Sequence, residues 1–358
     1  MSRPLRQHPP AGGVPALPWV GTSGGRGGGF TLIEVLVSLA VLSLLMVFLF
    51  ALVGRVTSVW RGAADAIGQW QSARRGFETM TRQISQATLN TVWAYYDESG
   101  NLTTSDPKHY GRHSDLQFVS GPTSSIIPTV TNTVSQGVFF QAPLGRARDN
   151  TLRGLPNLLN VCGFYVQFNR SADFVPNTGI FVRTRAKYRF RLMQINEPTE
   201  ALSVYAQQGA NNFEWITKPI NNGAARPLAE NIVALFLLPR FSRMDTSNGA
   251  LLAPNFFYNS RNSANFTSGA LKGNTLHQLP PLIQVTMVAI DETSATRLEE
   301  QSGNTMPTLI PTGKFQTAAD FEDDLEAFEE ELTNRGLRFR TFTSLIAIRG
   351  AKWGGDQP

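Results

Sequence analysis

Glu34 stands at the start of a long apolar run, a position where an ionised side chain needs a chemical explanation. It follows Gly27-Gly28-Gly29-Phe30-Thr31-Leu32-Ile33, and the run Val35–Val53 behind it is interrupted only by two serines. A carboxylate at membrane depth is costly and usually marks a functional pairing, yet no basic side chain stands beside this one. Cleavage between Gly29 and Phe30 would create an α-amine about one helical turn from Glu34. On a neighbouring copy, that amine would neutralise the carboxylate during assembly.

The apolar run is long enough to cross a lipid bilayer. As an α-helix its roughly nineteen residues reach about 30 Å, which matches the hydrocarbon core of a membrane and exceeds an ordinary signal-peptide core. Two interpretations stay open at this point: a cleaved segment that enters an assembly, and an uncleaved signal anchor.

The segment Gly29-Phe30-Thr31-Leu32-Ile33-Glu34 with its apolar run resembles the cleavage and methylation signal of type IV prepilins and type II secretion pseudopilins. The resemblance implies that a membrane prepilin peptidase cuts after Gly29 and N-methylates Phe30. It also implies that Glu34 guides assembly with other pilin or pseudopilin subunits. Prepilin peptidase, sister subunits and the membrane are therefore the expected partners, and no cofactor is expected.

Composition changes along the chain predict four regions. Residues 1–29 form a Gly- and Pro-rich leader, 30–53 the transmembrane and assembly helix, 54–95 an amphipathic helix continuing it, and 96–358 a globular head. Beyond the membrane run, apolar residues recur at gaps of three and four, which places them on one helical stripe. The stripe comprises Val56, Trp60, Ala63, Ile67, Trp70, Ala73, Phe77, Met80, Ile84 and Ala87.

The head reads as short β-strands separated by turn residues. Candidate strands are Leu116–Ser120, Gly137–Ala142, Gly163–Asn169, Lys187–Gln194, Ile232–Leu238, Leu282–Ile290 and Thr341–Arg349. Two long polar insertions are expected in the head, at Ser242–Gln278 and at Asp291–Gln316. We therefore predict an α+β, pilin-like fold, with a long N-terminal helix packed on an antiparallel β-rich head.

The net charge and the cysteine content limit which functions the chain is expected to have. The 358 residues carry a formal charge of +5, part of which comes from three arginines of the leader. So small a surplus makes nucleic acid an unlikely partner. Cys162 is the single cysteine, so no intrachain disulfide can form. It lies in an apolar strand-like run and is expected to be a buried small side chain rather than a nucleophile.

A basic strand is the second candidate site. Arg183, Arg185, Lys187, Arg189 and Arg191 alternate with less polar residues along Phe181–Leu192. A period of two places all five cations on one face of a strand. This face is either an anion-binding ridge of an adhesin or of a DNA- or glycan-binding protein, or a face paired with acidic side chains.

A late acidic helix is predicted after Thr317-Ala318-Ala319-Asp320, which has capping-box spacing. Phe321, Leu325, Phe328 and Leu332 follow at helical spacing, and Gly336 can close the helix. Its many carboxylates spread around the axis, so a solvated face is favoured over a calcium site.

Enzymatic or metal chemistry has little support in the sequence. The histidines are His8, His109, His113 and His277; the i,i+4 pair His109 and His113 could bind zinc on a helix. Pro107 and Gly111 make a helix there unfavourable, so a polar loop is expected. We expect no enzyme, no catalytic residue and no bound metal, although a membrane-anchored enzyme stays an alternative.

The remainder of the chain carries a further resemblance. Tyr188–Met193, Ala229–Leu235, Leu279–Asp291 and Arg349–Trp353 look like the large pilin-like proteins of the Verru/Chthon cassette protein C family. Leu279-Pro280 before an apolar strand is similar to the J-type minor pseudopilins. These resemblances imply a minor structural subunit near a filament tip. It would be a single-pass protein of a bacterial inner membrane, with its head in the periplasm or at the cell surface.

Overall fold

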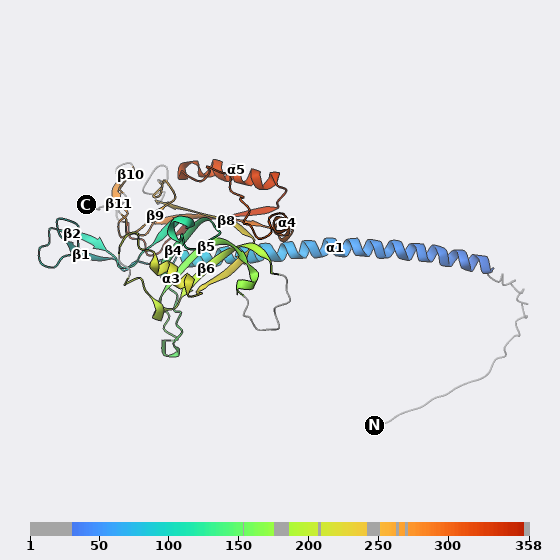
Figure 1. Ribbon diagram of the computed structural model, residues 1–358, viewed down its shortest axis with the longest axis horizontal. Helices are drawn as coiled ribbons and strands as arrows, with labels where there is room; N and C mark the ends of the chain where they lie inside the picture. Colours follow the sequence, from blue (N-terminus) through green and yellow to red (C-terminus); the bar gives the residue numbers. More distant parts are fainter. Residues whose placement is uncertain are drawn as a thin grey trace, which may run out of the picture. The chain divides into compact units, whose positions relative to one another are not determined.

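The chain divides into two compact units, which meet in sequence at Trp60 and Arg61. The computed structural model describes residues 31–152, 154–174, 186–206, 209–241, 251–262, 265–268 and 271–353, without the side chains of residues 58, 61–69, 265–268 and 271–273. Figure 1 shows the helices and strands, coloured along the sequence from blue at the N-terminus to red at the C-terminus.

The helices are α1 (Leu32–Ile84), α2 (Thr123–Ile126), α3 (Glu214–Asn221), α4 (Glu292–Ser302) and α5 (Phe321–Asn334). The strands are β1 (Val92–Tyr96), β2 (His109–His113), β3 (Val119–Pro122), β4 (Thr133–Pro143), β5 (Leu159–Arg170), β6 (Tyr188–Glu197), β7 (Ala225–Glu230), β8 (Ile232–Arg240), β9 (Tyr258–Asn259), β10 (Asn265–Ser268), β11 (Leu271–Asn274), β12 (Leu282–Ile290) and β13 (Phe339–Ala347). All strand pairs among the described residues are antiparallel, which confirms the predicted α+β class.

The helix α1 is shorter than the sequence predicted. It ends at Ile84, whereas we expected helix to residue 95, and Val92–Tyr96 forms β1 instead. The chain already joins the sheet at Thr88, whose N–H donates to Gln141 O at 2.9 Å. The run Val92-Trp93-Ala94-Tyr95-Tyr96 is rich in β-branched and aromatic residues, which favour strands over helix.

The last turns of α1 are packed against the sheets. Ala73, Phe77, Met80 and Ile84 of the predicted stripe are buried, and each large apolar side chain contributes about 1.5–3 kcal/mol. Val56 and Trp60, at the start of the same stripe, are exposed. Gly76 lies at the closest approach, because a Cβ there would stand 2.9 Å from Ala229 Cβ on β7.

The largest sheet has six strands in the order β7-β6-β5-β4-β3-β9. Both of its faces are covered, so neighbouring residues of one strand enter different cores. Phe140 joins the core shared with α1 and β8, whereas Phe139 joins the core around Trp215 of α3. Burial on both faces explains the continuous apolar runs, in contrast to the alternation of a half-solvated sheet.

A three-stranded sheet in the order β13-β12-β8 completes the main core, together with α5. Phe321, Phe328 and Leu332 of α5 are buried, and the rings of Phe236 and Phe321 lie 5.8 Å apart. Gly336, at φ +67°, ends α5 in a Schellman motif. The Gly336 N–H donates to Thr333 O, and the Leu337 N–H donates to Leu332 O.

Three local predictions were wrong. The Thr317 side chain makes no cap hydrogen bond, because residues 318–320 form a 3₁₀ turn ahead of α5. The segment 291–316 contains α4, whose N-terminus is capped by Asp291 accepting from Ser294 N at 2.7 Å. Within 242–278, residues 242–250 lie outside the described residues, and β9 joins the edge of the large sheet.

Candidate functional site

The N-terminus of α1 carries a reciprocal capping box. The Glu34 Oε2 atom accepts from Thr31 N and from Thr31 Oγ1, each at 2.9 Å, and Thr31 Oγ1 accepts from Glu34 N at 3.3 Å. Thr31 thus serves as N-cap and Glu34 as the third helical residue. The Thr-x-x-Glu spacing could have revealed this role of Glu34, which our sequence reasoning missed. Gly29 and Phe30 lie outside the described residues.

The first half of α1 presents apolar side chains around its circumference. Leu32–Thr57 is long and apolar enough to cross a membrane, and none of its most apolar window is buried. Its large exposed side chains include Leu32, Leu36, Leu44, Phe48 and Phe50. So much exposed apolar surface needs either lipid or other helices around it.

The comparisons with known proteins bear on this same segment. Residues 26–50 match the family model described as the prokaryotic N-terminal methylation motif. The match covers Gly29, Phe30 and Glu34 and supports a type IV pilin-like N-terminal signal. One helix within the described part of the chain is long and apolar enough to span a membrane, and its place behind such a motif is consistent with a membrane-anchored pilin. A search of curated proteins and a search of solved structures give no match.

The basic strand differs from the predicted ridge. Arg183 and Arg185 lie outside the described residues, and β6 begins at Tyr188. Lys187 is half exposed and its Nζ lies 3.0 Å from Glu292 Oε1. Arg189 and Arg191, in contrast, are only 2% and 1% exposed. These two cations therefore do not form an exposed anion-binding surface, and the prediction is corrected for them.

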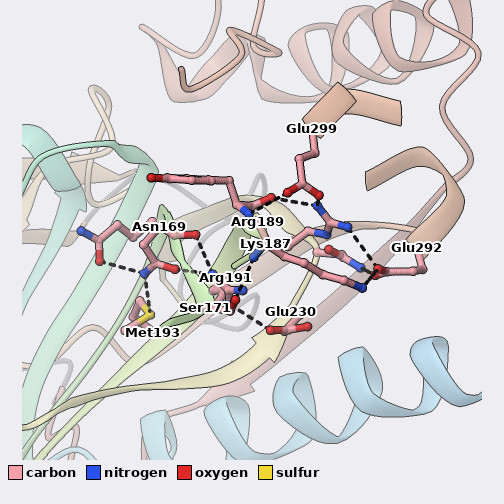
Figure 2. A network of polar contacts seen from close by, with 12 residues as sticks. Asn169, Ser171, Lys187, Arg189, Arg191, Met193, Glu230, Glu292 and Glu299 are labelled. Carbon is pink, nitrogen blue, oxygen red and sulfur yellow. Dashed lines mark hydrogen bonds and ion pairs between the residues drawn. The ribbon is translucent and has the colours of Figure 1, made fainter. Parts of the chain in front are cut away.

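Arg189 is held by two glutamates of α4 (Figure 2). Its Nη1 lies 2.5 Å from Glu299 Oε2 and its Nη2 3.1 Å from Glu292 Oε1. Thr296 Oγ1 accepts from the same Nη2 at 3.2 Å. The guanidinium therefore joins β6 to α4 inside the head, a typical use of a rigid, multidentate donor.

Arg191 is held within the sheet itself, as Figure 2 also shows. Its Nε lies 3.0 Å from Glu230 Oε1 of β7, and its Nη1 donates to Asn169 O at 2.7 Å and Asn169 Oδ1 at 2.6 Å. The acidic partners thus come from β7 and α4, not from the late helix that the sequence suggested.

One acidic side chain of the late helix α5 is buried rather than exposed to solvent. Asp324 is buried, and its carboxylate accepts from Phe315 N at 2.6 Å and pairs with Lys314 Nζ at 3.0 Å. Arg335 pairs with Glu331 at 2.6 Å on the exposed side. The buried carboxylate thus anchors the 314–315 turn to the helix.

The histidine pair lies on β2 rather than in a loop. The His109 ring stacks on Tyr96, with centroids 5.5 Å apart, while His113 Nε2 lies 3.3 Å from Asp115 Oδ1. His277, distant in sequence, brings its ring to 5.0 Å from that of His113. Burial, aided by the nearby His113, lowers the pKa of His277 to about 4, so this imidazole is neutral at physiological pH.

Cys162 is fully buried on β5, as predicted. Desolvation raises the pKa of its thiol to about 12, although Arg146 opposes the shift. A thiol that stays protonated and sealed from solvent is a poor nucleophile.

Glu197, at the end of β6, gives the head a specific pH dependence. Its side chain is 5% exposed, and desolvation raises its pKa from 4.5 to about 7 against the opposing charge of Arg148. Between pH 4.5 and about pH 7, the Glu197 carboxyl is deprotonated in the unfolded chain but still protonated in the folded chain. The free energy of unfolding should therefore fall by roughly 1–3 kcal/mol as pH rises through this interval, and stay low above it.

Urea unfolding of the full chain in detergent at pH 5 and pH 8 checks this expectation. Glu197→Gln should remove the fall, whereas Glu200→Gln should not, because hydrogen bonds from the backbone of Asp149 and of Glu200 lower the pKa of the Glu200 carboxyl. An equal pH dependence in wild type and Glu197→Gln would contradict the assignment.

Proposed function

We propose that this chain is a minor pilin-like or pseudopilin-like structural subunit. In this proposal prepilin peptidase cuts between Gly29 and Phe30, and the processed chain enters a type IV pilus or type II secretion-like filament with sister subunits. The observation that carries the proposal is the methylation motif at residues 26–50 followed by the exposed apolar helix Leu32–Thr57.

The proposed mechanism uses the carboxylate and the apolar surface of α1 in succession. Before assembly, Thr31 satisfies Glu34 through the capping box, which lowers the cost of placing this carboxylate at the membrane boundary. During assembly the α-amine of Phe30 on an adjacent subunit pairs with Glu34. The apolar side chains of Leu32–Thr57 then exchange lipid contacts for contacts with neighbouring helices.

The size of the head supports a low-copy position. The second compact unit begins at Arg61 and holds the two larger sheets, so it would crowd a helical shaft. We place the subunit at or near the tip, anchored before assembly in a bacterial inner membrane with its head in the periplasm. The proposal gives no residue a catalytic role.

The N-terminal mass of the full chain from native membranes tests the processing step. With prepilin peptidase present, we expect a terminus at N-methylated Phe30; without the peptidase, we expect the uncut chain. Gly29→Leu should keep the leader, because the peptidase of the resembled family cuts after glycine, while Gly27→Leu serves as the matched control within the same glycine run. An uncut terminus in both strains would leave a signal-anchored head and refute the proposal.

A further inference from the structure

A pocket of about 300 Å³ lies between the β1–β2 hairpin, the turn at residues 277–279 and the C-terminal segment at residues 350–352. Figure 1 shows that hairpin at the end of the β-rich unit opposite α4, so the pocket is separate from the network around Arg189. All of its lining residues belong to the second compact unit. The proposed role in a filament does not involve this pocket.

The pocket presents hydrogen-bond donors and positive charge. Arg112 and Lys352 line it, together with His277 and Gln278, and the described lining residues include no carboxylate. Among the described residues, neither cation forms an ion pair. Burial lowers the pKa of Arg112, as expected for a cation that has lost water without gaining an acidic partner. Such a guanidinium favours an incoming anion.

The imidazole of His277 is fixed as a neutral donor. Its Nδ1 accepts from Ser114 N at 3.2 Å, so the ring proton lies on Nε2. The residue is held at φ +53°, with its own N–H donating to Ser260 O at 2.5 Å. The carboxylate of Asp115, which lies near the histidines, is already engaged by His113 and by Asn90 Nδ2.

The lining also includes apolar side chains. Trp93 is the β1 partner of Arg112, and the Arg112 guanidinium carbon lies over the indole ring, 5.8 Å from its centroid, in a cation–π contact. The indole is 65% exposed, and Leu89 and Leu279 also line the pocket. Gly350 allows the C-terminal segment to close the pocket, because a Cβ there would stand 2.7 Å from Ala87 O.

We propose that this pocket binds an anion, a carboxylate or a phosphate, carried on a ring of about hexose size. The anionic group would meet Arg112, Lys352 and the His277 Nε2–H, while the ring lies against the apolar side chains of Leu89 and Leu279, beside the Arg112–Trp93 pair. Convergent donors set beside apolar side chains are typical of small-ligand sites, and the volume is at the small end of their range.

Calorimetric titration of the full chain in detergent tests the proposal with three probes that share one ring. D-glucuronate and D-glucose 6-phosphate carry the two anionic groups, and D-glucose carries neither. Saturable binding of one or both anions, with glucose at least about tenfold weaker, is the expected result. Whichever anion binds more tightly identifies carboxylate or phosphate as the preferred group.

Variants assign the binding to this pocket. Arg112→Met and Lys352→Met should each weaken binding by about tenfold or more, since each removes a charge-assisted contact. Lys108→Met is the matched control, because Lys108 lies beside the same hairpin but pairs with Asp106 outside the pocket.

Three results would overturn the proposal: no saturable binding of either anion, equal binding of glucose, or unchanged binding by Arg112→Met. Binding that appears only after Asp356→Asn would also overturn it, because it would assign the pocket to this chain's own acidic residue four positions beyond Lys352 in sequence. None of these outcomes depends on cleavage after Gly29, so the pocket and the filament proposal fail independently.

Discussion

Glu34→Ala should lower incorporation of the subunit into filaments by more than about tenfold while leaving its insertion in the membrane intact. The carboxylate is the proposed partner of a neighbouring α-amine, and its removal leaves that amine as an unpaired charge among apolar helices, which is costly. The apolar helix Leu32–Thr57 is unchanged by the substitution, so the membrane anchor should persist. The amount of subunit in sheared surface filaments, divided by the amount in membranes, is the measurement.

Two further substitutions separate pairing from capping. Thr31→Val removes the hydroxyl that donates to Glu34 but keeps the backbone N–H contact, so it should reduce incorporation less than Glu34→Ala. Ser38→Ala removes a hydroxyl that bonds only to Val35 O, about one turn further along, and should leave incorporation unchanged. Normal incorporation of Glu34→Ala would refute the pairing mechanism.

Sequence patterns predicted those parts of the fold whose residues carry their own signal. Leu282–Ile290 matches β12 at both ends, because a run rich in Ile and Val, broken only by Gln284 and Thr286, is typical of a largely buried central strand. The stripe through Phe77, Met80 and Ile84 is buried as its spacing predicted. By contrast, β7 contains Arg226 and Pro227 and was missed, since an edge strand tolerates residues that a central strand excludes.

At the candidate sites, sequence patterns could not show which residues distant in sequence come together. Period two correctly placed Arg189 and Arg191 on one strand, yet it could not show that Glu292 and Glu299 come back more than a hundred residues later to pair with Arg189. The pocket at Arg112 was equally hidden, because His277 and Lys352 reach it only through the folded topology. Local spacing thus predicts elements, whereas burial of a charge depends on partners distant in sequence.

Arg189→Met should lower the free energy of unfolding of the head by about 3 kcal/mol or more, because it leaves the carboxylate of Glu299 without its main partner. Arg189 is nearly inaccessible to solvent, so water cannot replace the lost contacts on β6 and α4. Urea unfolding of the full chain in detergent, followed by tryptophan fluorescence, measures the change. Lys187→Met is the matched control on the same segment, and its exposed pair with Glu292 should contribute less than about 1 kcal/mol.

A double-mutant cycle then separates the pair from its surroundings. If the ion pair carries the effect, Arg189→Met combined with Glu299→Leu should be less destabilising than the sum of the single changes, by up to about 3 kcal/mol. A strictly additive cycle would show that Arg189 acts through packing of its aliphatic stem and its contact with Thr296. A non-additive result would show that β6 and α4 are joined by a charge pair, which is why Arg189 is not available for an external anion.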